Sequence, residues 1–111
     1  MTARRGSMRP PARAASLAAI LFALPCAAAA DDAAVRKGAK LYENNCSTCH
    51  GDDLQNNSGI AFDLRRLHAD EHARFVNAVL HGKNAMPSWD GRLTSDQIES
   101  LWAYIRANAY Q

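Results

Sequence analysis

The stretch that decides the fold of this 111-residue chain is Cys46-Ser47-Thr48-Cys49-His50. Two cysteines separated by two residues can form a redox-active disulfide, but thiol–disulfide enzymes of the thioredoxin type place such a pair in a βαβ unit. No β-branched strand precedes Cys46, and the residues before it have the spacing of a helix. The cysteine pair must therefore be interpreted together with the histidine that follows it.

A C-x-x-C pair followed directly by histidine is the attachment motif for c-type haem. Thioether bonds from Cys46 and Cys49 would fix the edge of the macrocycle, and His50 would then be held beneath the iron as an axial ligand. A zinc site would need two more ligands at matching spacing, and the sequence has no second cysteine pair, because Cys26 stands alone near the N-terminus. We therefore expect one covalent haem c.

The first thirty residues have the three regions of a secretory signal peptide. Residues 1–13 carry four arginines, residues 14–24 form an apolar run, and residues 25–30 end in small residues. The apolar part is shorter than the about 20 residues that a bilayer span needs. We expect cleavage after Ala30, a mature domain of residues 31–111, and a soluble periplasmic protein with no stable membrane insertion.

Charge is distributed unevenly along the chain. Four of the 13 basic residues lie before residue 14, whereas all 11 acidic residues follow Ala30, so residues 31–111 have a net charge of −2. Proteins that bind nucleic acids need a basic stripe or patch that contacts the phosphate backbone. A faintly acidic domain argues against nucleic-acid partners, and it predicts only modest electrostatic steering of other partners.

Apolar residues recur at helical spacing along residues 31–111. Few stretches alternate apolar and polar residues as a strand would. We expect helices over residues 33–45, over residues 68–81, and from Thr94 or Ser95 to about Ala109, with a polar loop over residues 51–66. Three short helices give a thin core, since small domains bury a low fraction of their surface. We therefore expect the haem to complete the core and the apo chain to be largely unfolded.

Three residues mark the boundaries and contacts of these helices. Asp70 is a candidate N-cap of the second helix, and Gly82 is suited to the position after its last residue. Gly38 lies on the apolar face of the first helix, where the absence of a side chain would let another backbone approach closely.

Four segments together resemble the class I cytochromes c in their short, mono-haem bacterial form. They are Gly38-x-x-x-Tyr42, Cys46–Gly51, Met86-Pro87-Ser88-Trp89 and Leu101–Ile105. The resemblance covers residues 35–107 and implies the all-α cytochrome c fold, with three to four short helices around one covalently bound haem. It also implies that His50 and Met86 are the axial ligands of the iron, and that Gly38 and Tyr42 meet the last helix near Tyr104.

The setting of Met86 supports the same role independently. The following Pro87 restricts Met86 to extended or turn backbone, which suits a loop over the haem face better than a packed helix. A neutral thioether favours ferrous iron and should raise the reduction potential. The competing sixth ligands are histidines, and they would give a bis-histidine iron: His68, His72 and His81.

Two protein ligands leave no open site on the iron, so we expect an electron carrier of the respiratory chain and not an enzyme. The alternative is a haem peroxidase or gas sensor with a labile sixth position, which carbon monoxide binding would reveal. The stretches 63–65 and 82–89 are similar to small cytochromes that accompany quinoprotein alcohol dehydrogenases. This similarity implies a quinoprotein dehydrogenase as donor. We also expect an oxidase or another cytochrome as acceptor, and a monomeric protein.

One feature departs from the family pattern. Many relatives have a proline shortly after the haem motif, next to the carbonyl that accepts the Nδ1 proton of the proximal histidine, whereas here Pro87 is the next proline. Some carbonyl should still orient His50, and we expect it between residues 56 and 60. Arg65 and Arg66 either bind the haem propionates or are solvated surface charges.

Overall fold

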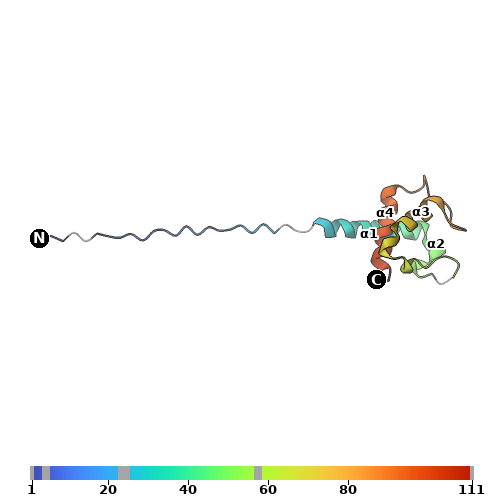
Figure 1. Cartoon of the computed structure of the whole chain (residues 1–111), viewed down its shortest axis with the longest axis horizontal. Helices are drawn as coiled ribbons and strands as arrows, with labels where there is room; N and C mark the ends of the chain where they lie inside the picture. Colours follow the sequence, from blue (N-terminus) through green and yellow to red (C-terminus); the bar gives the residue numbers. More distant parts are fainter. Residues whose placement is uncertain (1, 4–5, 23–25, 57–58, 111) are drawn as a thin grey trace.

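The computed structural model describes residues 2–3, 6–22, 26–56 and 59–110 of the chain. The described residues before position 23 form an extended, exposed segment that leads away from a helical body (Figure 1). Within the described part of the chain, no helix is both long enough and apolar enough to cross a bilayer.

Within the described residues, the helical body contains four α-helices, and three short 3₁₀ helices lie between the second and third of them. The α-helices are α1 (Cys26–Asn45), α2 (Ser47–His50), α3 (His72–His81) and α4 (Ser95–Asn108). The 3₁₀ helices are η1 (Asp52–Leu54), η2 (Leu64–Arg66) and η3 (Ala69–Glu71). The described residues form no strand, and their one isolated bridge joins Lys83 to Met86. The expected all-α fold class is confirmed.

The crossing of α1 and α4 organises the body, and Gly38 makes it possible (Figure 1). A Cβ atom added to Gly38 would lie 1.9 Å from the carbonyl oxygen of Ser100, so any other residue would push the two backbones apart. One turn further along α1, the rings of Tyr42 and Tyr104 pack with their centroids 5.3 Å apart. The expected contact between these helices is therefore confirmed.

Helix α4 begins as its local sequence predicts. The Thr94 hydroxyl oxygen accepts a hydrogen bond from the backbone N–H of Gln97 at 3.2 Å, and the Gln97 side chain accepts one from the N–H of Thr94 at 2.9 Å. This reciprocal capping box satisfies two donors that a helix start leaves without intrahelical partners. Thr94, not Ser95, is the N-cap.

The starts of the other two helices differ from the expectation. Helix α1 begins at Cys26 instead of residue 33, because the intervening alanines have the highest helix propensity of any residue. Helix α3 begins at His72, after a 3₁₀ turn whose N-cap is His68, so Asp70 is not a cap. The carboxylate that helps to cap the 3₁₀ turn is that of Glu71, which accepts a hydrogen bond from the backbone N–H of His68 at 2.8 Å.

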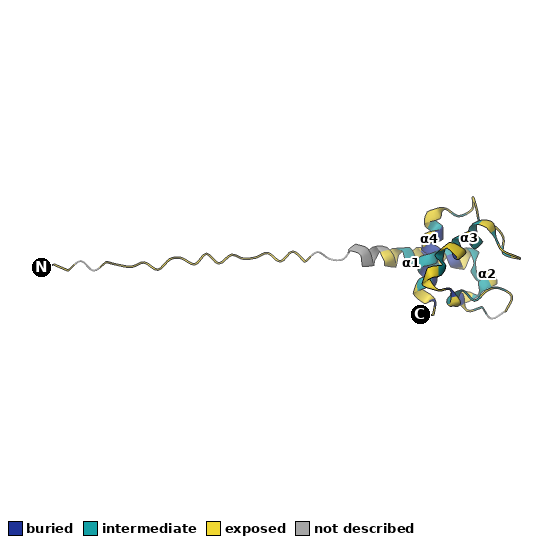
Figure 2. Ribbon diagram, in the orientation of Figure 1, coloured by how far each residue is buried: buried dark blue, intermediate teal, exposed yellow. Residues whose placement is uncertain are grey.

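Buried residues gather where the helices meet (Figure 2). Helix α4 contributes Ile98, Leu101 and Ile105, as its apolar face predicts. The polar segment after the C-x-x-C-H motif contributes too, because Leu54 in η1 is fully buried and Leu67, the residue directly after the expected loop, is 4% exposed. The loop is therefore fastened to the core by one leucine within it and one directly after it.

Candidate functional site

The C-x-x-C-H motif forms a single helical turn at the end of α1. The Cys46 N–H bonds to the Tyr42 carbonyl at 2.8 Å, and the His50 N–H bonds to the Cys46 carbonyl at 2.9 Å. Cys46 is half-buried and Cys49 is exposed, and both are free thiols. The two thiols and the imidazole are therefore presented together from one short, rigid segment.

The environment of Cys46 argues against thiol–disulfide exchange. Burial, with a smaller contribution from the neighbouring Cys49, raises the pKa of the Cys46 thiol to about 11. An attacking cysteine in an exchange enzyme needs the opposite shift, because the thiolate is the nucleophile. The pair is better suited to a stable covalent bond with a bound group than to redox cycling.

The His50 ring is oriented by a backbone carbonyl. Its Nδ1 lies 3.0 Å from the Phe62 carbonyl oxygen, and because a carbonyl can only accept, Nδ1 carries the proton. In the neutral ring, Nε2 is then the nitrogen with the free lone pair, which can bind a metal ion. The expectation that the partner lies between residues 56 and 60 is wrong: the loop reaches the ring two residues later.

Tyr42 connects the helix crossing to this ring. Its hydroxyl donates a 2.6 Å hydrogen bond to the carbonyl of Gly51, the residue directly after His50. Tyr42 is 2% exposed, and burial, with smaller contributions led by the nearby Cys46, raises its pKa above the usual value. The position of the His50 loop is thus tied to the α1–α4 core through a buried, neutral phenol.

Met86 lies in a tight turn after α3, as its sequence setting predicts. The N–H of Met86 bonds to the Lys83 carbonyl at 2.9 Å, and the Lys83 N–H bonds to the Met86 carbonyl at 3.1 Å. Asn84 adopts the left-handed conformation within the turn, with φ of 54°. A Cβ on Gly82 would lie 2.5 Å from the Met86 carbonyl oxygen, so the turn packs directly against the helix end.

The competing histidines are distributed over α3 and its approach. The Nε2 atom of His72 lies 3.0 Å from the Glu99 carboxylate, and its ring meets Trp102 edge-on at 5.2 Å. His68 caps η3, and His81 is the last residue of α3. Among the described residues, no three His, Cys, Asp or Glu side chains form a cluster that could hold a metal ion.

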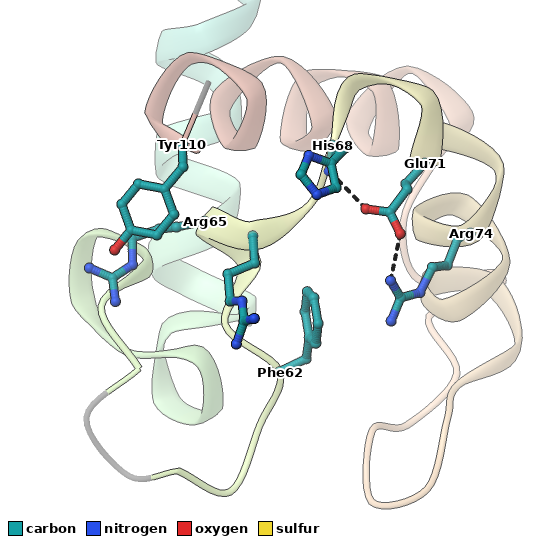
Figure 3. Close-up of a pocket in the computed structure, with 7 residues that line it drawn as sticks. Phe62, Arg65, His68, Glu71, Arg74 and Tyr110 are labelled. Atoms are coloured by element: carbon teal, nitrogen blue, oxygen red, sulfur yellow. Dashed lines mark hydrogen bonds and ion pairs between the residues drawn. The ribbon is translucent and has the colours of Figure 1, made fainter.

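A pocket of about 510 Å³ lies beside the Phe62 side chain (Figure 3). Its charged and polar lining residues are Arg65, Arg66, His68, Glu71 and Arg74, and Tyr110 closes one side. Arg74 pairs with Glu71 at 2.7 Å, and its guanidinium lies over the Phe62 ring. Since the carbonyl of Phe62 also contacts His50, this basic pocket adjoins the candidate site.

The two consecutive arginines of the pocket differ in their surroundings. Arg65 donates two hydrogen bonds to the Asp63 carboxylate, at 3.0 and 3.1 Å, and these bonds hold the pKa of Asp63 below its usual value. Within the described residues, Arg66 has no carboxylate at ion-pair distance. Arg66 is therefore better placed than Arg65 to bind an added carboxylate.

Comparison with known proteins identifies relatives of most of the chain. Residues 33–105 match the profile of the family described as cytochrome C oxidase, cbb3-type, subunit III. The chain is 35% identical over 96 residues to cytochrome c6 of Thermosynechococcus vestitus, an alignment that covers 83% of either protein. No solved structure matches the chain significantly.

Two longer proteins contain a similar segment. The quinohemoprotein alcohol dehydrogenase ADH-IIG of Pseudomonas putida is 33% identical over 88 residues, which are 78% of this chain and 12% of the dehydrogenase. The cbb3-type cytochrome c oxidase subunit FixP of Azorhizobium caulinodans is 30% identical over 105 residues, 90% of this chain and 36% of the subunit. This chain corresponds to one part of each.

Replacing Tyr42 with Phe should cost about 1–2 kcal/mol of unfolding free energy at pH 7, because the Gly51 carbonyl loses its buried donor. The pKa of Tyr42 is higher in the folded than in the unfolded protein, so the wild type loses stability as the pH rises above about 10. The variant should lack this part of the loss. Urea unfolding between pH 7 and 11 measures both effects.

Tyr110→Phe is the matched control, because that tyrosine is exposed. It should leave the unfolding free energy at pH 7 nearly unchanged. An equal alkaline slope in wild type and Tyr42→Phe would contradict the assigned role of the buried phenol.

Proposed function

Because this chain belongs to the class I c-type cytochromes, we propose that Cys46 and Cys49 bind its haem and that His50 and Met86 ligate the iron. Members of this family carry covalent haem c, and the length of the domain fits a single haem. The chain is a haem-based electron carrier. When bound, the haem supplies one-electron redox chemistry at its iron.

The hydrogen bond between His50 Nδ1 and the Phe62 carbonyl is the observation that carries this proposal. It fixes the ring orientation and selects the tautomer in which Nε2 is free to donate its lone pair. The free thiols of Cys46 and Cys49 flank the same turn, where two thioether bonds would hold a macrocycle against the ring.

The turn around Met86 supports its proposed role as the sixth ligand. Both its backbone N–H and its carbonyl are bonded to Lys83, so the thioether extends from a fixed backbone. His72 is a weaker candidate, because its Nε2 faces the Glu99 carboxylate. If His50 and Met86 both held the iron, they would leave no iron position for a substrate, so the proposed role is electron transfer without catalysis.

Met86→Ala should still bind haem covalently, but it should lower the reduction potential, because the thioether that favours ferrous iron is removed. It should also let carbon monoxide bind readily to the reduced protein. Proton NMR of the reduced protein gives the direct measurement, since a methionine methyl held over the haem ring is shifted strongly upfield. That signal should be present in the wild type and absent from the variant.

The Cys46→Ala, Cys49→Ala double variant is the control for attachment. It should yield no stable haem protein and a largely unfolded chain, whereas Met86→Ala keeps its haem after denaturation. A wild type that lacks the methyl signal, or a variant that retains it, would refute the Met86 assignment and favour a peroxidase or gas sensor with a labile sixth position.

We also propose that residues 1–30 are a signal peptide and that the mature protein is periplasmic. In support, the apolar side chains of the leader have no cover in the described structure: Leu17, Ile20, Leu21 and Phe22 are 78–96% exposed. The exported protein should begin at Asp31 and weigh one haem more than its chain. Intact-mass measurement tests this, and retention of Met1 on most of the exported protein would contradict it.

The proposed electron donor is a quinoprotein dehydrogenase, and the proposed acceptor is an oxidase or another cytochrome. The similarity to segments of ADH-IIG and FixP supports both classes. Reduction by a purified quinoprotein dehydrogenase of the same cell should be fast in stopped-flow measurements. It should depend weakly on salt, because the mature chain has a net charge of only −2. Fast reduction by another donor, but not by this dehydrogenase, would contradict the donor assignment.

A further inference from the structure

The last carbonyls of α3 are bonded to donors from the Met86 loop. A helix leaves its final four carbonyl groups without intrahelical donors. The Ala78 carbonyl accepts the N–H of Gly82 at 2.8 Å, at the helix end itself. The next two carbonyls accept donors from beyond Met86: Val79 bonds the Trp89 N–H at 2.8 Å, and Leu80 bonds the Ser88 hydroxyl.

These bonds turn residues 82–89 into a loop that is closed at both ends. It leaves α3 at Gly82, turns through the Lys83–Met86 bridge, and returns to α3 at Ser88 and Trp89. Met86 lies two residues before the point of return. The attachment of Ser88 to α3 therefore limits how far the Met86 side chain can move.

Among the contacts between described residues, Ser88 is the anchor of this loop that acts through its side chain. Its hydroxyl group donates a hydrogen bond to the Leu80 carbonyl, and the hydroxyl oxygen accepts one from the Asp90 N–H at 3.3 Å. Ser88 is exposed, so its contribution comes from these hydrogen bonds and not from packing in the core. The Trp89 anchor, in contrast, is a backbone N–H, which remains when the side chain is changed to that of any residue except proline.

We propose that Ser88 is a positioning residue that holds Met86 in place as the sixth ligand. The inference rests on the proposed role of Met86. An external ligand can reach the iron only when the loop opens, and opening that breaks the Ser88–Leu80 bond becomes easier when the bond is missing. Ser88 therefore governs how well the loop excludes external ligands from the sixth position of the iron.

The test compares Ser88→Thr with Ser88→Val in the haem-loaded protein, because these side chains have nearly the same shape and differ in the hydroxyl. Imidazole is the probe ligand, titrated optically into the ferric protein. One lost hydrogen bond should raise the apparent imidazole affinity of Ser88→Val roughly fivefold. Ser88→Thr should bind imidazole as the wild type does.

Ser100→Ala is the control, since it removes another hydroxyl that donates to a backbone carbonyl, that of Asp96 at 3.0 Å, within α4 and outside residues 82–89. It should leave imidazole affinity unchanged. Equal affinities for Ser88→Val and wild type would overturn the proposal, as would an equal rise in Ser100→Ala. If the wild type lacks the upfield methionine methyl signal, the assignment of Met86 itself fails, which separates the two outcomes.

Discussion

The close approach of α1 and α4 at Gly38 is the contact on which the site depends. It brings the backbones together at the Ser100 carbonyl, where no side chain fits. It also buries Tyr42 one turn later, with its hydroxyl directed at the Gly51 carbonyl. Because Gly51 follows His50, the crossing of two helices sets the start of the loop that orients the His50 ring.

The far end of the same loop is fastened to α4 and to the short segment that follows it. The Arg106 guanidinium donates to the Leu67 carbonyl at 2.6 Å, and the Tyr110 N–H donates to the Arg65 carbonyl at 2.8 Å. The loop is thus held by α1 where it begins and by α4 where it ends. The Phe62 carbonyl, which lies between these attachments, is kept facing His50 although its own segment has no regular secondary structure.

The sequence predicts the features that depend on local chemistry. The Thr94 cap and the α4 face follow from residues within one or two helical turns, and Gly38 signals a close contact because a side chain is missing. The burial of Leu54 and the role of Phe62 could not be predicted in this way. Leu54 lies in a polar loop without periodicity, and Phe62 acts through its backbone carbonyl, which every residue possesses.

The segment after Phe62 is held in place without a proline, since the next proline after His50 is Pro87. Proline would limit the conformations of the unfolded loop and fix its backbone. Here Asp63 accepts the backbone N–H of Arg65 at 3.0 Å and also binds the Arg65 guanidinium. The same guanidinium lies over the Tyr110 ring, at 5.3 Å from its centre. A side-chain network around Asp63 and Arg65 therefore stiffens the backbone next to Phe62. Because Arg65 is paired in this network, Arg66 is the one of the two consecutive arginines that has no carboxylate at ion-pair distance within the described residues.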